Sequence, residues 1–234
     1  MIFSLRLFSR TSVHQEQLPD PLEEPTMEEE EEKKIIKSLP EGSCSRFTVW
    51  RKSLVISCKG FTVINSNGDL VYRVDSYMER PEELVLMDGS GHSVLTTLRH
   101  KKLGQAESWV IYDGEADTES SLTSSNKPTW HVRKHTCSIL RGRRQEESVL
   151  ANVFRGNKSS SDDERRSFVV EGSFTRRSCK VLNESRRTVA EVKRKEAMVG
   201  GASFGLEVFQ LIVQPDFDDG IAMALVLILD QMYS

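Results

Sequence analysis

Cysteine and aromatic residues are scarce in this chain of 234 residues. The number and spacing of the cysteines argue against a zinc ribbon, a redox motif and a disulfide-bonded framework. The four cysteines lie far apart and form no Cys-x-x-Cys pair, and aromatic residues make up 7% of the chain. A zinc ribbon or redox motif is built on such a pair, and a disulfide framework needs a secretory route that no N-terminal signal indicates. We therefore expect four unbridged thiols.

Sequence motifs for nucleotide and cofactor chemistry are also missing. No Walker loop is present, and no G-x-G-x-x-G motif opens a helix. The Gly-rich pieces at residues 88–91 and 200–202 are typical of turns. We expect a protein that is not an enzyme and that holds no cofactor.

The first 42 residues lack any folding pattern. Prolines interrupt this segment repeatedly, and it contains five consecutive glutamates at residues 28–32. Such a composition buries too little apolar surface to offset the entropy lost on ordering. We expect a disordered acidic tail at residues 1–42 and one folded domain at residues 43–234.

From Phe47 onward, short segments rich in β-branched and aromatic residues follow one another with turns between them. The segments in the first half of the domain are 47–50, 53–57, 61–65, 70–74, 84–87, 94–98 and 108–112, and similar segments continue from Thr129 to Val213. Asn67-Gly68 between two of them is a strong hairpin signal. About a dozen strands at this spacing predict an all-β, antiparallel sandwich or barrel.

The longest apolar run, residues 221–229, stands near the C-terminus and follows Asp216, Asp218 and Asp219. A helix here, about residues 217–232, has no polar face and must be surrounded by protein or lipid. A bilayer span needs roughly 20 apolar residues, which is longer than this run. The aspartates favour a helix N-terminus. Because a wide barrel has an interior that strand side chains alone do not fill, we expect this helix to occupy it.

Several short motifs, in order and spacing, connect the chain to a known family. They are Gly60-Phe61-Thr62-Val63-Ile64, Asn67-Gly68, Tyr72-Arg73-Val74-Asp75, Leu86-Met87-Asp88 with Gly91, Val94-Leu95-Thr96-Thr97-Leu98-Arg99, Trp109 with Tyr112 and Gly114, Glu171-Gly172-Ser173-Phe174, Val189-Ala190-Glu191-Val192, and Val213 with Pro215 and Phe217-Asp218. In this layout the chain resembles the plant LURP-one-related family, which is similar to the Tubby C-terminal domain and the phospholipid scramblases. The long acidic N-terminal segment departs from the family pattern.

The resemblance implies a twelve-stranded antiparallel barrel around a hydrophobic C-terminal helix, without enzymatic activity. It also implies a binding or scaffold protein associated with plant defence, which engages anionic phospholipid or a protein partner. A membrane-tethered transcription regulator and a scramblase-like lipid protein remain alternatives. We expect a monomer without a transmembrane segment, located in the cytoplasm, in the nucleus or peripherally at the plasma membrane.

Basic residues supply the candidate anion site. Lys and Arg outnumber Asp and Glu about two to one between His131 and Lys195, although the whole chain has a net charge of -3. Guanidinium groups bind phosphate in a bidentate manner, so turns that converge at one end of a barrel could hold a headgroup. The candidates are Arg141, Arg143, Arg144, Arg176, Arg177, Lys180, Arg186 and Arg187. No DNA-binding motif accompanies them, and we do not expect nucleic-acid binding.

Two further patterns are weaker. His131, His135 and Cys137 share one face of a predicted strand, but no fourth ligand accompanies them, so we expect an ordinary strand and no metal. Ser160 and Ser161 precede acidic residues and fit an acid-directed kinase site, beside arginines that could pair with a phosphate.

Overall fold

The structure is a computed structural model, which describes residues 43–56, 58–76, 82–101, 106–115, 127–136, 149–156, 166–195 and 205–233. All of these residues belong to the compact unit Gly42–Ser234. Several sequence-based predictions lie outside the described residues, namely those for residues 1–42, Cys137, Arg141, Arg143, Arg144, Ser160 and Ser161.

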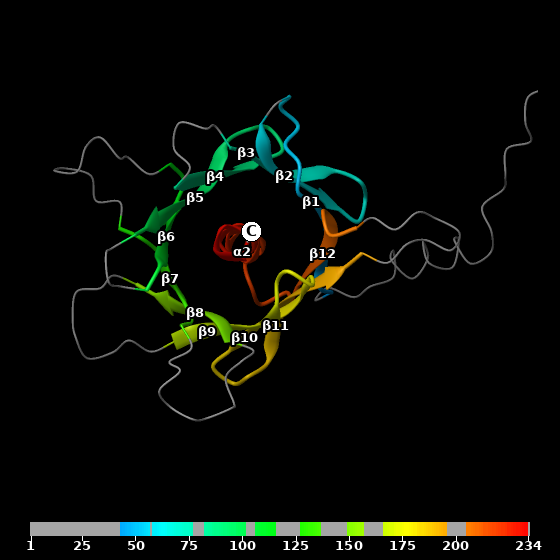
Figure 1. Cartoon of the computed structure of the whole chain (residues 1–234). Coiled ribbons are helices and arrows are strands. Elements are labelled where there is room, and N and C mark those ends of the chain that lie inside the picture. Colours follow the sequence, from blue (N-terminus) through cyan, green and yellow to red (C-terminus); the bar gives the residue numbers. More distant parts are fainter. Residues whose placement is uncertain are drawn as a thin grey trace, which may run out of the picture. The chain divides into compact units, whose positions relative to one another are not determined.

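The described residues form a closed barrel of twelve strands, each antiparallel to its neighbours (Figure 1). The strands are β1 (Ser45–Trp50), β2 (Lys59–Asn65), β3 (Leu70–Ser76), β4 (Glu83–Asp88), β5 (Ser93–His100), β6 (Ser108–Asp113), β7 (Trp130–Lys134), β8 (Val149–Arg155), β9 (Arg166–Ser173), β10 (Ser178–Asn183), β11 (Thr188–Arg194) and β12 (Val208–Val213). Neighbours in sequence are neighbours in the barrel, and β12 closes it by pairing with β1. Closure leaves no strand edge unpaired. The predicted fold is confirmed.

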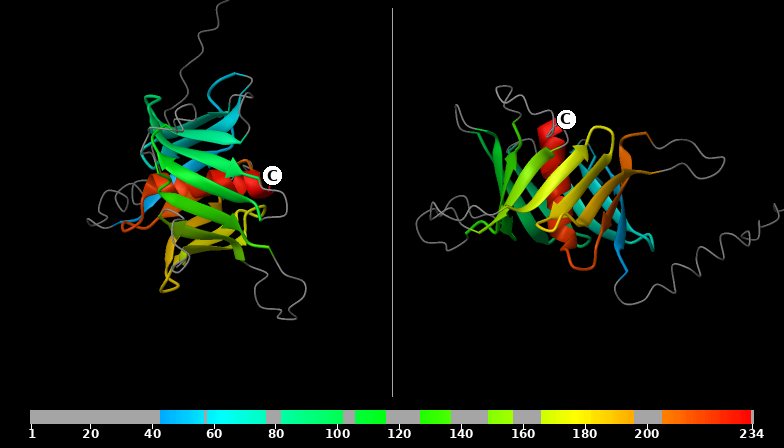
Figure 2. Two further views of the ribbon diagram at one scale, coloured as in Figure 1. Left: turned by 90° about the vertical axis from the view of Figure 1, so that its left-hand side faces the viewer. Right: turned by 90° about the horizontal axis from the view of Figure 1, so that it is seen from below.

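Helix α2 (Asp219–Tyr233) runs along the axis of this barrel, as Figures 1 and 2 show. Every residue from Gly220 to Leu229 is buried. Strands surround the helix, and a helix enclosed in this way needs no polar face. The Trp109 indole of β6 donates a hydrogen bond of 2.6 Å to Gln231 near the helix end. The helix begins two residues later than the sequence suggested, and its predicted place inside the barrel is confirmed.

The two rims of the barrel are distinguished by the helix. We name the rim where α2 begins the amino rim; there, Ser45 at the start of β1 hydrogen-bonds Asp219 at 3.2 Å. We name the rim where α2 ends the carboxyl rim; there, the Tyr233 hydroxyl donates to the Leu150 carbonyl of β8 at 3.1 Å. Because each hairpin reverses the chain, successive connections alternate between the two rims.

One predicted strand is absent. Residues 53–57 carry the apolar sequence of a strand, but residues 51–56 and Cys58 form the connection between β1 and β2. The Ser53 side chain is buried and donates a short hydrogen bond to Asp75 of β3, which takes the backbone out of the ladder. Because β1 runs from the amino rim to the carboxyl rim, this connection lies on the carboxyl rim, beyond the strands.

Asp218 caps the amino end of α2. Its Oδ1 accepts a hydrogen bond of 2.7 Å from the Ile221 amide, and its carbonyl accepts the first helical bond, from Ala222 at 3.0 Å. Replacing a capping aspartate with alanine typically costs about 1 kcal/mol. Asp218→Ala should therefore lower the melting temperature by about 2–4 °C for a domain of this size, measured by calorimetry. Asp216→Ala is the matched control, and an equal loss in both variants would contradict the cap.

Candidate functional site

Charge is distributed unequally between the two rims. Among the described residues, carboxylates outnumber cations on the amino rim, where the cations are Arg46, Lys127, Arg155, Arg166, Arg186 and Arg187 and the carboxylates are Asp69, Asp88, Asp113, Glu115, Glu184, Asp216, Asp218 and Asp219. Cations outnumber carboxylates on the carboxyl rim, where the cations are Arg51, Lys52, Lys59, Arg99, Lys101, Lys134, Arg176, Arg177, Arg194 and Lys195 and the carboxylates are Asp75, Glu82, Glu83, Glu107, Glu207 and Asp230. The carboxyl rim is thus the cationic one.

Some cations of the carboxyl rim serve the helix that ends there. Arg51 pairs with Asp230 of α2 at 2.9 Å, and Lys134 donates to the Met232 carbonyl at 3.1 Å. Positive side chains beside the last turn stabilise the negative end of the helix dipole and its unpaired carbonyls. These cations are explained by folding alone.

Arg177, in the β9–β10 turn, also faces inward. Only 6% of its surface is exposed. Its guanidinium lies 4.4 Å from the Phe174 ring centre and 4.3 Å from that of Phe209, and its Nε donates to the Leu206 carbonyl at 2.9 Å. Burial lowers the pKa of this guanidinium, and Asp230, 4.0 Å away, opposes that shift. The group is a cation because arginine stays charged in proteins. The structure assigns Arg177 to the core rather than to an exposed anion site.

Other cations of the carboxyl rim are exposed and form no ion pair with any described residue. These are Lys52, Lys59, Arg176 and Arg194. They are close in the fold because β1 pairs with β2 and β12, and Arg194 lies opposite Phe209. Arg176 joins them because its neighbour Arg177 is bonded to Leu206, just before β12. A cation without a carboxylate partner is available to an external anion.

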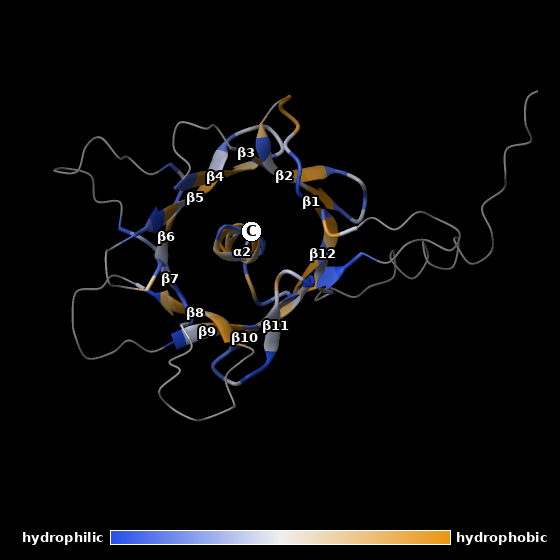
Figure 3. Ribbon diagram, viewed as in Figure 1, coloured by the Kyte–Doolittle hydropathy of each residue, from blue (hydrophilic) through white to orange (hydrophobic). Residues whose placement is uncertain are grey.

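Apolar side chains are exposed on the same rim. Trp50 is 41% exposed, Leu54 52%, Ile56 92% and Leu206 40%, and these are the exposed large hydrophobic residues of the described chain. The Arg51 amide donates to the Glu207 carbonyl at 2.8 Å, which joins the start of the connection that carries Leu54 and Ile56 to the residue after Leu206. We name these four residues the apolar patch. Figure 3 shows the apolar β1–β2 connection outside the strands.

A network of buried polar groups holds the β1–β2 connection in place. Ser53 hydrogen-bonds Asp75, which in turn pairs with Arg73 of β3. The Ser53 hydroxyl also accepts a bond of 2.9 Å from the Val55 amide, and Thr62 donates to the Lys52 carbonyl at 2.8 Å. The Ser53 side chain is thus fixed inward, while its neighbour Leu54 and, two residues further, Ile56 stay exposed.

The sequence-predicted anion site is divided by the fold. Arg176 and Arg177 lie before β10 and Arg186 and Arg187 after it, so the two pairs occupy opposite rims. Arg186 pairs with Glu171 at 2.7 Å, and Lys180, within β10, pairs with Glu191 at 3.6 Å. The sequence missed Lys52 and Lys59, whose place on the rim follows from strand pairing.

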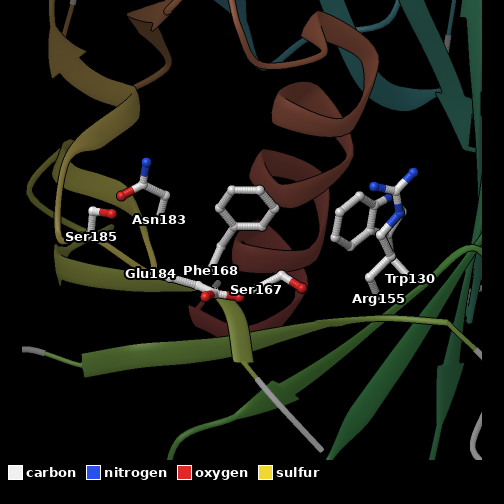
Figure 4. A pocket seen from close by; sticks show the side chains of 7 residues that line it. All are labelled: Trp130, Arg155, Ser167, Phe168, Asn183, Glu184 and Ser185. Carbon is white, nitrogen blue, oxygen red and sulfur yellow. The ribbon is translucent and has the colours of Figure 1, made fainter.

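A hollow of about 260 Å³ lies on the amino rim (Figure 4). Its lining residues are Trp130, Arg155, Ser167, Phe168, Asn183, Glu184 and Ser185. The Arg155 guanidinium stands over the Trp130 ring at 5.4 Å from its centre, and Phe168 packs against Phe217. Its two charged groups, Arg155 and Glu184, are of opposite sign, and the hollow therefore has no preference for an anion.

A second hollow on the amino rim is acidic. Ser45, Gln214, Pro215, Asp216, Phe217, Asp218 and Asp219 line it. Burial raises the pKa of Asp219, and the hydrogen bond from Ser45 opposes that shift. Within the described residues, no three metal-ligating side chains lie close enough to share an ion. This rim repels anions rather than binding them.

The segment before β12 matches a hydrolase motif in its amino-acid sequence. Gly201-Ala202-Ser203-Phe204-Gly205 matches G-x-S-x-G, whose serine is a nucleophile only on a sharp turn from a strand to a helix. Gly205 leads instead to β12, a strand. Residues 201–204 lie outside the described residues.

Comparison with known proteins places the whole barrel in one group. The family model described as LURP-one-related matches residues 45–230. Protein LURP-one-related 17 of Arabidopsis thaliana is 47% identical over 195 residues, which cover 82% of this chain and 85% of that protein. Protein LURP-one-related 8 of the same plant is 42% identical over 189 residues, covering 80% of this chain and 86% of that protein. These names describe no enzymatic activity.

A solved structure shares the fold. An X-ray structure of a protein from Arabidopsis thaliana aligns with a TM-score of 0.56 at 24% identity, covering 83% of this chain and 94% of that one. Across the described part of the chain, no helix combines the length and apolarity needed to cross a bilayer.

Proposed function

The chain belongs to the LURP-one-related family, and from this membership we propose that it is a non-catalytic binding protein that recognises anionic phospholipid headgroups through its carboxyl rim. In this proposal it serves plant defence as a binding module. The proposal concerns the outside of the barrel because α2 fills the interior, where an enclosed active site would otherwise lie.

One observation carries the proposal: exposed cations without carboxylate partners gather on the carboxyl rim. Lys52, Lys59, Arg176 and Arg194 are available to phosphate, whereas Arg186 on the amino rim is held by Glu171. Each basic side chain near an anionic leaflet contributes about 1 kcal/mol. Four of them give a binding energy of a few kcal/mol, which depends strongly on ionic strength.

Charge reversal on the carboxyl rim tests this function. Lys52→Glu or Arg176→Glu replaces an attraction with a repulsion, a change of about 2 kcal/mol, so each variant should bind anionic vesicles about 30-fold more weakly. Flotation with phosphatidylserine and phosphoinositide vesicles measures this effect, with phosphatidylcholine vesicles as the neutral comparison. Binding of the unchanged chain should weaken as salt rises.

Arg187→Glu on the amino rim is the matched control and should bind as the unchanged chain does. Its side chain is exposed like that of Arg176, and it lies beyond the other end of β10. Loss of binding in this variant alone would move the site to the amino rim. No binding of the unchanged chain to anionic vesicles at low salt would refute the proposal.

A further inference from the structure

Two members of the apolar patch, Leu54 and Ile56, belong to no strand of the barrel. Ile56 is almost wholly exposed to water. Isolated exposed apolar residues are normal on protein surfaces, but here every exposed large hydrophobic residue among those described lies on one rim. Such grouping indicates an interaction surface.

The connection that presents these residues is built to hold them outward. Ser53 is anchored on Asp75, and Cys58 donates to the Val55 carbonyl at 3.2 Å, which closes a turn around Ile56. A Cβ at Gly60 would lie 1.8 Å from the Val74 carbonyl oxygen and 3.1 Å from the Ser53 Cβ, and glycine there lets the connection pack closely on the wall. Because hydrogen bonds hold Ser53 and Val55 before any ligand is present, binding through Leu54 and Ile56 costs less conformational entropy.

The surroundings of the patch match one kind of surface. Lys52 lies over the Trp50 ring at 5.3 Å from its centre, and Lys59 follows the connection directly. Aliphatic side chains flanked by an aromatic residue and by lysines are typical of segments at the boundary between headgroups and acyl chains. An anionic bilayer offers negative charge to the lysines and apolar depth to Ile56 together.

We infer that the β1–β2 connection inserts Leu54 and Ile56 into the acyl boundary of an anionic bilayer, with Trp50 at the level where the headgroups meet the acyl chains. This inference rests on the proposed function, in which the carboxyl-rim cations bring the barrel to the membrane. It goes beyond that function because headgroup recognition alone requires no apolar contact. Insertion fixes the orientation of the barrel, with the carboxyl rim on the membrane and the amino rim away from it.

Trp50 provides a native probe of this insertion. Vesicles of phosphatidylserine with lipids brominated along the acyl chain quench a tryptophan that enters them. Trp109 is fully buried and Trp130 nearly so, hence Trp50 should account for the quenching. We expect full-length protein to be quenched on binding, and we expect Trp50→Phe to bind but to lose the quenching.

Ile56→Ser separates insertion from headgroup binding. Since its side chain makes no buried contact, this variant should fold normally, yet it should bind anionic vesicles about 10- to 100-fold more weakly and keep the salt dependence. Binding of the unchanged chain without quenching, and with Ile56→Ser equal to it, would overturn the insertion and leave the proposed function standing. Absence of any vesicle binding would overturn both. Self-association abolished by Ile56→Ser, without vesicle binding, would instead make the patch an interface between two copies.

Discussion

Leu225→Asp should abolish folding of the barrel. Leu225 lies at the middle of α2, is 1% exposed and belongs to the buried core that the helix forms with residues of the strands. Removing a buried leucine side chain costs about 2–5 kcal/mol, and an unpaired buried carboxylate adds several kcal/mol more. The total is comparable to the whole stability of a typical domain, about 5–15 kcal/mol. Circular dichroism and thermal unfolding of the purified variant should show no cooperative transition.

Two variants control this experiment. Leu225→Met keeps the apolar volume and should lose less than about 1.5 kcal/mol. Ile56→Asp introduces the same carboxylate at an exposed position and should unfold as the unchanged protein does. A soluble Leu225→Asp protein with a normal melting transition would show that the helix is not required inside the barrel.

Arg177→Ala is expected to produce the second large effect, a loss of about 3 kcal/mol. The change removes a hydrogen bond to Leu206, contacts with two aromatic rings and a positive charge near Asp230. Breaking a buried ion pair from one side costs about 3–5 kcal/mol. Asp230 keeps Arg51 as a partner at 2.9 Å, and we therefore expect the lower end of that range. The melting temperature should fall by about 6–12 °C, measured by calorimetry.

Arg176→Ala is the adjacent control. Arg176 is exposed, and a surface substitution of this kind usually changes stability by less than about 0.5 kcal/mol. In vesicle binding the order should be reversed. Arg176→Ala should bind anionic vesicles more weakly than Arg177→Ala, since only Arg176 faces outward. Equal stability of the two variants would contradict a structural role for Arg177.

The sequence predicted the fold well because its strongest signals are local. The Asn67-Gly68 turn requires a positive φ, and Gly68 has a φ of 90° between β2 and β3. The apolar run of α2 has no polar face, and this property already excludes a surface helix. Both signals are complete within a few residues, so tertiary contacts did not alter them.

The candidate site was less predictable than the fold. It depends on whether each side chain of a turn points inward or outward, and on which rim each turn lies. Arg176 and Arg177 are adjacent residues of the same type, yet Arg176 is exposed and Arg177 is buried. The turn places Arg177 at a φ of 51°, which directs its side chain differently from that of Arg176. Residues 53–57 have the composition of a strand, but a distant partner, Asp75, draws Ser53 inward. Neither outcome is encoded in local pattern.

The distribution of charged residues between the two rims could not be predicted from the sequence for a related reason. Basic residues close in sequence, such as Arg176 and Arg186, are separated by the length of β10, whereas Lys52 and Arg194 lie on one rim through the pairing of β1, β12 and β11. Proximity in a barrel is set by strand order and by the alternation of hairpins between rims. A search for clusters along the chain misses such a surface.

Amide hydrogen exchange of the full chain, with and without anionic vesicles, tests the central claim most directly. The claim is that α2 stays inside the barrel while the carboxyl rim meets the membrane. The amides of residues 221–229 should remain protected in both conditions, and residues 51–56 should gain protection when vesicles are added. Loss of protection in α2 on vesicle binding, with no change at residues 51–56, would contradict the account by showing that the helix leaves the barrel for the lipid.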